Sequence, residues 1–227
     1  VMRQTLLFNT MEAVQLNANR RNGNLRLYEF GNCYFYDEAA RDAEKPLSSY
    51  SEQYRLAIAV TGAAVPQSWN AKPQASSFFT LRAVAEKLLR RFGLDIYALK
   101  CEPLQSDLFG EALTMALNGR ELLQMGVVAP RIRRAFDLKQ EVYYLEMNFD
   151  ALVKSTRKHR IAFEELSKFP EVKRDLALLV DRQVTFAQLR AIALATERKL
   201  LKSVSLFDVY EGDKLPEGKK SYALSFV

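Results

Sequence analysis

The stretch that decides the fold lies at residues 169–181, and its sequence is Phe-Pro-Glu-Val-Lys-Arg-Asp-Leu-Ala-Leu-Leu-Val-Asp. After the charged pair Arg174 and Asp175, Leu176, Leu178 and Val180 fall at every second position, as in a β-strand with one covered face. We therefore predict a strand over residues 174–180 that is led in by a proline and carries Arg-Asp at its mouth.

Three further elements are predicted downstream of this strand: a helix over residues 185–199 and strands over 201–211 and 220–227. The order β-α-β-β makes up the first two-thirds of a ferredoxin-like βαββαβ unit, so we expect a truncated unit of this kind. In residues 201–211 the apolar positions shift from Val204 and Leu206 to Phe207 and Val209, which predicts a bulge that turns Asp208 and Tyr210 outward.

Residues 1–156 contain a longer mixture of helices and strands. The dipeptide Asn118-Gly119 predicts a type I′ hairpin between strands at 112–117 and 122–128. Gly31-Asn32 predicts a bulge or kink in a strand pair or one bent strand at 25–37, and Asp150 is predicted to cap a helix that runs to residue 156. The other predictions are helices at 3–20 and 79–92, a helical turn at 130–136, strands at 55–61, 96–101 and 142–149, loops at 38–52 and 64–77, and a linker at 157–168.

The positive charge of the chain is concentrated in its last third. The net charge is +6, and residues 1–150 carry 18 Lys and Arg against 17 Asp and Glu, whereas residues 151–227 carry 15 against 10. This asymmetry is compatible with a polyanionic partner and also with a solvated basic surface.

The composition indicates a globular protein of the cytoplasm. Hydrophobic residues make up 48% and charged residues 26%, and the sequence contains neither a spanning segment nor a secretory signal. The two cysteines, Cys33 and Cys101, are too few for a disulfide framework, and we expect both to be buried as small apolar residues.

The sequence offers no catalytic or metal-binding constellation. The single histidine, His159, stands in a basic segment away from any paired nucleophile, and it is scattered relative to the two cysteines. No glycine-rich phosphate loop is present. Arg131, Arg133 and Arg134 form a local basic cluster that we interpret as a solvated helical turn.

Three motifs carry a resemblance to a known family. They are the proline-led strand with Arg174 and Asp175, Leu-Phe-Asp-Val-Tyr-Glu-Gly at 206–212, and Pro-Glu-Gly-Lys-Lys-Ser at 216–221. In this order and spacing they resemble the ferredoxin-like anticodon-binding domain at the C-terminus of bacterial phenylalanyl-tRNA synthetase beta subunits.

The first two-thirds of the chain resembles the catalytic-like module of the same subunit, with motifs that are individually less specific. The resemblance rests on Leu-Arg-Leu-Tyr-Glu-Phe-Gly at 25–31, Trp69 before the helix that begins near Phe79, and Gln-Met-Gly-Val-Val at 124–128. One departure is Phe8-Asn9, where the family often has Pro-Gly after a pair of leucines.

The resemblance implies an α+β fold, with a class II synthetase-like antiparallel sheet and flanking helices at 1–156 and a truncated βαββ domain at 169–227. It implies that the adenylation site lies on an alpha subunit, so that this chain keeps the fold without catalytic or metal-binding residues. The whole enzyme would be an alpha-two beta-two tetramer that joins phenylalanine to its tRNA with ATP and magnesium. The editing domain and the beta-subunit magnesium ligands are expected upstream of Val1.

The resemblance also implies contact with the anticodon region of the tRNA. Unpaired RNA bases stack on aromatic rings and hydrogen-bond through their edges, while Lys and Arg take the phosphates. The residues expected to make these contacts are Arg174, Asp175, Phe207, Asp208, Tyr210, Lys219, Lys220 and Ser221.

Two other functions stay open at this point, a protein–protein scaffold without a role in RNA binding and a stand-alone basic enzyme. The charged residues of the last third also admit a structural explanation, in which Arg174 pairs with Asp208 or Asp175 pairs with Lys219.

Overall fold

The structure is a computed structural model, and it describes residues 2–157, 159, 163 and 169–227. Two compact units follow one another along the chain, Val1–Ile161 and Ala162–Val227. The predicted linker at 157–168 lies outside the described residues except at positions 157, 159 and 163. No helix in the described ranges is long and apolar enough to cross a membrane.

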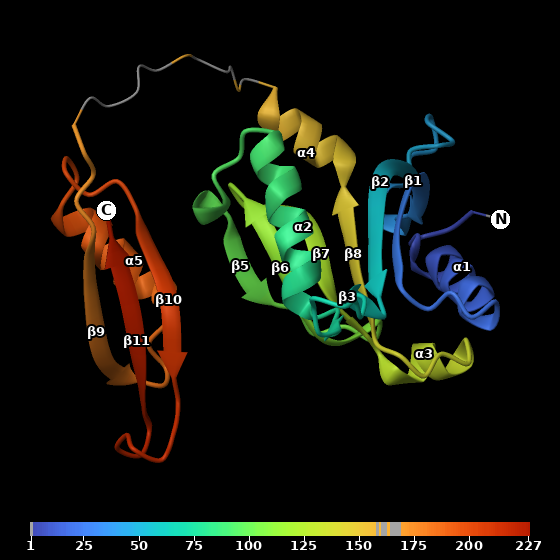
Figure 1. Cartoon of the computed structure of the whole chain (residues 1–227). Coiled ribbons are helices and arrows are strands. Elements are labelled where there is room, and N and C mark those ends of the chain that lie inside the picture. Colours follow the sequence, from blue (N-terminus) through green and yellow to red (C-terminus); the bar gives the residue numbers. More distant parts are fainter. Residues whose placement is uncertain (1, 158, 160–162, 164–168) are drawn as a thin grey trace. The chain divides into compact units, whose positions relative to one another are not determined.

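The first unit combines a large antiparallel sheet with helices on both faces (Figure 1). Its helices and strands, in chain order, are α1 (Leu7–Asn19), β1 (Leu25–Tyr36), the 3-10 turn η1 (Glu38–Ala40), β2 (Tyr50–Thr61), β3 (Ala63–Val65), β4 (Gln74–Ala75), α2 (Phe78–Arg91), the 3-10 turn η2 (Ile96–Ala98), β5 (Lys100–Pro103), β6 (Phe109–Leu117), β7 (Arg120–Val128), α3 (Pro130–Ala135), β8 (Val142–Asn148) and α4 (Phe149–Thr156).

Six of these strands form one sheet in the order β1-β2-β8-β7-β6-β5, with every neighbouring pair antiparallel. Successive residues of β8 face opposite sides, so Tyr144 packs in one core with Leu7 and Met11 of α1. Leu145 packs in a second core on the other side, with Leu81 and Leu89 of α2. The predicted antiparallel sheet with flanking helices is confirmed.

Glycine in β1 serves a different purpose from the one predicted. Of the bulge or kink predicted at Gly31-Asn32, the bulge is wrong, because the pairing of β1 with β2 runs from Leu25–Thr61 to Tyr36–Tyr50 without a register shift. A Cβ atom at Gly31 would lie 2.0 Å from Nη2 of Arg3 and 3.1 Å from Cδ2 of Leu6. A larger residue here would displace the Arg3 guanidinium and crowd Leu6, because the N-terminal segment lies close to β1 at this point.

Several other predicted boundaries also differ from those in the structure. The helix predicted at 3–20 begins only at Leu7, and the strand predicted at 55–61 begins at Tyr50. The predicted strand at 96–101 is η2 followed by β5, and the predicted loop at 64–77 contains β3 and β4. Cys33 is buried as predicted, but Cys101 is exposed on β5.

Of two features predicted from local sequence, the turn between β6 and β7 is confirmed and the cap of α4 is not. Asn118 and Gly119 have φ angles of 51° and 77°, which confirms the predicted type I′ turn between β6 and β7. The predicted cap of α4 is wrong by two residues, since the side chain of Asn148 accepts from the Ala151 amide at 2.9 Å. Asp150 instead accepts from the amide of Tyr54 on β2 at 2.9 Å.

The second unit has the predicted βαββ order. It consists of β9 (Arg174–Asp181), α5 (Phe186–Thr196), β10 (Val204–Tyr210) and β11 (Lys219–Phe226), and its strands form an antiparallel sheet in the order β10-β11-β9 (Figure 1). Thr185 and Gln188 form a capping box at the start of α5. The register of β10 shifts between Leu206 and Asp208, which confirms the predicted bulge.

Candidate nucleic-acid interface

The two faces of the three-stranded sheet differ in what covers them. Val204, Tyr222 and Leu224 are buried and share one face by the strand register. We call it the helix face, because α5 lies on it: Arg174 and Phe226 line a pocket of ≈ 740 Å³ together with Ala193 and Thr196 of α5. The opposite face, here the open face, carries Asp175, Ala177, Leu179 and Asp181 of β9, Lys219, Ser221, Ala223 and Ser225 of β11, and Ser205, Asp208 and Tyr210 of β10.

Most of the predicted RNA contacts gather on the open face. Asp175, Asp208, Tyr210, Lys219 and Ser221 belong to it by register. Phe207 is the extra residue of the bulge, and it is 59% exposed. Alternation from Leu206 already turns Phe207 towards the open face, and the bulge then brings Asp208 and Tyr210 to the same face.

The other two predicted contacts, Arg174 and Lys220, point to the helix face. Lys220 is only 8% exposed, and its Nζ lies 4.6 Å from the centroid of the Tyr222 ring, a cation–π distance. Arg174 is exposed, and its Nη1 donates to the carbonyl of Lys173 at 3.2 Å. Adjacent residues of a strand face opposite sides, so the sequence neighbours Lys219 and Lys220 are separated by the sheet.

The open face contains its own exposed ion pairs. Nζ of Lys219 lies 2.6 Å from Oδ1 of Asp181, and Nζ of Lys173 lies 3.9 Å from Oδ1 of Asp175. These are not the alternative pairs suggested by the sequence: the register sets Lys219 opposite Asp181 and Asp175 opposite Ser225. Exposed pairs of this kind stabilise a fold by at most about 1 kcal/mol, so a phosphate could replace either carboxylate at low cost.

Two aromatic side chains of this face are held by specific neighbours. Tyr210, which is 42% exposed, packs against the backbone of Gly212, where an added Cβ would lie 2.6 Å from its hydroxyl oxygen. Phe207 lies beneath the ammonium group of Lys173, with 5.9 Å between Nζ and the ring centroid. The sequence prediction missed Lys173, although it immediately precedes the Arg-Asp pair at the mouth of the strand.

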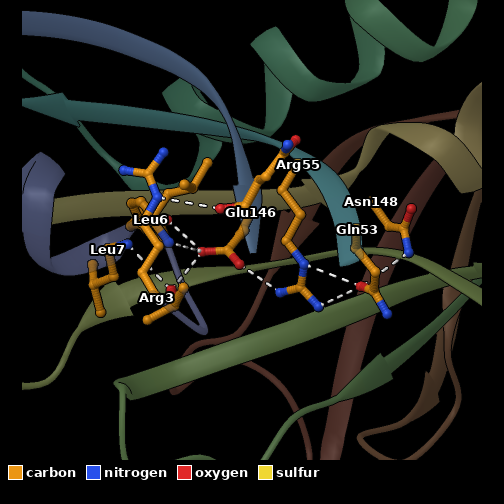
Figure 2. Close-up of polar contacts among 10 residues, drawn as sticks. Arg3, Leu6, Leu7, Gln53, Arg55, Glu146 and Asn148 are labelled. Carbon is orange, nitrogen blue, oxygen red and sulfur yellow. Dashed lines mark hydrogen bonds and ion pairs between the residues drawn. The ribbon is translucent and has the colours of Figure 1, made fainter. Parts of the chain in front are cut away.

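The first unit contains a buried polar network that the sequence prediction also missed (Figure 2). Glu146 of β8 is 2% exposed. Its Oε2 accepts from the Thr5 hydroxyl at 2.6 Å, the Tyr144 hydroxyl at 2.6 Å and the Leu6 amide at 3.1 Å, while its Oε1 accepts from Nη1 of Arg55 at 2.5 Å. The only hint in the sequence was a glutamate inside an apolar strand.

The charged groups of this network are hydrogen-bonded to one another. The guanidinium of Arg55 also donates to Oε1 of Gln53 and lies 4.9 Å from the centroid of the Phe35 ring. Burial, followed by the nearby Glu146 carboxylate, raises the pKa of the Tyr144 hydroxyl well above its usual value, so Tyr144 remains a donor. Three donors meet Oε2 of Glu146 and one meets Oε1, so the carboxylate anchors the chain before α1 to the sheet.

An exposed aromatic surface lies on the other side of β1 and β2. We call Tyr28, Phe30, Tyr54 and Phe149 the aromatic patch. The Phe30 ring stacks on Tyr54 at 5.8 Å and meets Phe149 edge-on at 5.1 Å, while Tyr28 remains 74% exposed. β1 is an edge strand of the six-stranded sheet, so the patch borders an edge that could meet another chain.

Two family profiles match this chain. That of the phenylalanyl tRNA synthetase beta chain CLM domain matches residues 1–149, and that of the ferredoxin-fold anticodon binding domain matches residues 167–227. Among solved structures, a pyrrolysyl tRNA synthetase from Desulfitobacterium hafniense has a TM-score of 0.49 at 15% identity, over 68% of this chain and 50% of that chain.

Curated relatives match along the full length of the chain. The phenylalanine–tRNA ligase beta subunit of Bacteroides thetaiotaomicron is 48% identical over 227 residues, that of Porphyromonas gingivalis 42% over 226, and that of Bacillus subtilis 33% over 227. The chain covers 28% of the length of the first of these proteins. With a family profile that spans most of the chain, these matches show that the chain belongs to the phenylalanyl-tRNA synthetase beta chain family.

Proposed function

We propose that this chain is part of the beta subunit of a phenylalanine–tRNA ligase and that residues 169–227 bind the anticodon region of the phenylalanine tRNA. One observation carries the proposal: the open face brings Phe207, Tyr210, Lys219 and Ser221 together on a sheet surface opposite α5. Exposed rings provide stacking for unpaired bases, and Lys219 and Ser221 provide donors for phosphates and base edges. The match to the anticodon-binding domain profile supports the same assignment.

In this proposal the RNA contacts come from the open face, with Asp175 and Asp208 as acceptors for base amino groups. Arg174 is exposed at the sheet end and can reach a phosphate beyond the base-binding surface. Lys220 contributes indirectly, since its ammonium group is buried against Tyr222 on the helix face.

Residues 1–156 form, in the same proposal, a non-catalytic module that packs against an alpha subunit and supports its active site. The aromatic patch on β1 and β2 offers an apolar surface for that contact. Two copies of each subunit would assemble into a tetramer in the cytoplasm. A scaffold without RNA binding is the competing function, because an apolar surface fits that function equally well.

ATP and magnesium belong to the whole enzyme in this proposal, at a site on the alpha subunit. Arg55 is already engaged by Glu146, Gln53 and the Phe35 ring, which does not favour a role for it in the arginine-to-triphosphate contact of a class II site. Within the ranges that the structure describes, no three His, Cys, Asp or Glu side chains gather as metal ligands.

The RNA assignment is tested with the full-length beta subunit assembled with its alpha subunit. The affinity for the phenylalanine tRNA is compared with the affinity for a transcript that lacks the anticodon stem-loop. We expect at least a tenfold loss on deletion, and we expect Tyr210→Ala to weaken binding of the complete tRNA only. Equal affinities for the two RNAs would overturn the assignment and leave the scaffold function.

A further inference from the structure

Lys173, Phe207 and Ser225 lie towards the end of the open face that is away from Lys219. Ser225 is in the central strand and pairs with Asp175 on one side and Ser205 on the other. Lys173 stands two residues before Asp175 on the same face, and its Nζ lies over the Phe207 ring of β10. The lysine side chain thus extends from the β9 side to the β10 side, over the row of the sheet that contains Ser225.

Ser225 has an unusual environment for a serine on a face without a helix. It is 3% exposed, and within the part of the chain that the structure describes its hydroxyl has no hydrogen-bond partner. A buried hydroxyl is almost always hydrogen-bonded, because leaving it without a partner forfeits its hydration. An unsatisfied hydroxyl in the row that Lys173 crosses therefore points to a partner that arrives from outside.

The contacts of the Lys173 ammonium group are weak, so a ligand can replace them readily. Its ammonium group is 3.9 Å from the Asp175 carboxylate and 5.9 Å from the Phe207 centroid, and the Lys173 and Asp175 side chains are both well exposed. Exposed ion pairs and exposed cation–π contacts are both weak. A nucleotide supplies a better partner for each group, a phosphate for the ammonium and a base for the ring.

We propose that Lys173, Phe207 and Ser225 form a subsite for one unpaired nucleotide, which Lys173 occupies in the free protein. The incoming base displaces Lys173 and stacks on Phe207, the displaced ammonium group binds the phosphate, and the Ser225 hydroxyl bonds to the base edge. This inference rests on the proposed function and adds two residues, Lys173 and Ser225, that the sequence prediction did not include.

The test uses the full-length beta subunit assembled with its alpha subunit and the phenylalanine tRNA. Lys173→Gln should lower the slope of log affinity against log salt by about one unit, as one lost phosphate contact does. Phe207→Leu keeps an apolar residue in the bulge, and it should weaken binding about tenfold with the slope unchanged. Ser225→Ala should weaken binding severalfold and change which base substitution in the anticodon loop is tolerated.

A fluorescent base gives a direct measure of the stacking step. 2-Aminopurine placed at successive positions of the anticodon loop should be quenched on binding at one position, and Phe207→Leu should remove that quenching at the same position. Equal circular dichroism spectra and melting temperatures of the variants and the parent protein exclude misfolding as the cause.

Lys219→Gln, at the other end of the open face, separates this inference from the proposed function. If Lys219→Gln weakens binding while the Lys173, Phe207 and Ser225 variants behave like the parent, the subsite is overturned and the proposed function stands. If all four variants bind the tRNA like the parent, both are overturned. The subsite is supported by a lower salt slope in Lys173→Gln, weaker binding in Phe207→Leu and Ser225→Ala, and loss of the 2-aminopurine quenching in Phe207→Leu.

Discussion

The carboxylate of Glu146 accepts a hydrogen bond of 3.1 Å from the backbone amide of Leu6, although 140 residues separate them in the sequence. This bond satisfies a donor at the start of α1, where Leu6 has no side chain able to cap the helix. The same carboxylate binds Arg55 of β2 and Tyr144 of β8, so one buried side chain links the first helix to two strands of the sheet.

Replacing Glu146 by alanine should therefore destabilise the first unit strongly. The change leaves the partly buried Arg55 without its carboxylate and the Leu6 amide and Tyr144 hydroxyl without an acceptor, for a loss of about 3–5 kcal/mol. The measurement is urea-induced unfolding, with Glu121→Ala at an exposed position of β7 as the matched control. Equal midpoints for the two variants would contradict the structural role of the network.

Gly31→Ala should destabilise the chain because the new methyl group meets the N-terminal segment. Arg3 can withdraw its guanidinium at the expense of its 2.6 Å ion pair with Glu29, but the Leu6 side chain is in the core and has little room to move. We expect a loss of about 1–3 kcal/mol, which is typical of overpacking. Gly110→Ala in β6 is the control, since its nearest atom is at 3.5 Å, and a similar melting temperature for both variants would refute the argument.

Lys219→Gln should reduce the electrostatic part of tRNA binding in the assembled enzyme. Removing one phosphate contact should lower the slope of log affinity against log salt by about one unit. Lys202→Gln is the control, because Lys202 lines the pocket on the helix face with Ala193 and Thr196. Affinity is measured by fluorescence anisotropy over a salt series, and identical slopes for the two variants would count against the open face.

Tyr210→Ala should weaken tRNA binding without changing the salt dependence. Stacking of a base on an aromatic ring is worth about 1–3 kcal/mol and involves no counterion release. Tyr210→Phe keeps the ring against Gly212 and should bind almost like the parent. If the phenylalanine variant loses as much affinity as the alanine variant, the hydroxyl rather than the ring makes the contact.

Tyr143 should ionise late and make stability depend on pH in the alkaline range. Its hydroxyl donates to Oε2 of Glu141 at 2.5 Å, and this bond raises the pKa of Tyr143 to about 12 from an ordinary value of 10. The unfolded chain loses this proton first, so stability from this group is complete below about pH 10 and falls as the pH rises towards 12.

Glu141→Gln should return the Tyr143 titration towards pH 10 and flatten the alkaline loss of stability. The measurement is the ultraviolet difference spectrum of phenolate against Tyr143→Phe, which isolates this tyrosine from the others. A Tyr143 titration that Glu141→Gln leaves unmoved would show that the hydrogen bond does not control the pKa.

The sequence by itself predicted the features that depend on neighbouring residues. The Asn118-Gly119 turn follows from the φ angles that these residues tolerate, and the βαββ order follows from the periodicity of apolar side chains. The bulge in β10 was visible as a shift in the alternation at Phe207, because side chains in a strand alternate with a period of two. The motif resemblance gave the family, which the matches bear out.

Tertiary structure alone decided the features that depend on contacts between distant residues. Gly31 was predicted as a bulge or kink, but the register has no bulge there, and the close contacts of Gly31 are with Arg3 and Leu6 of the N-terminal segment. The start of α1 depends on Glu146, and which of the neighbours Lys219 and Lys220 is buried depends on the face that α5 covers. Local propensity contains no information about these neighbours, because the residues that create each environment become adjacent only when the sheets and helices pack.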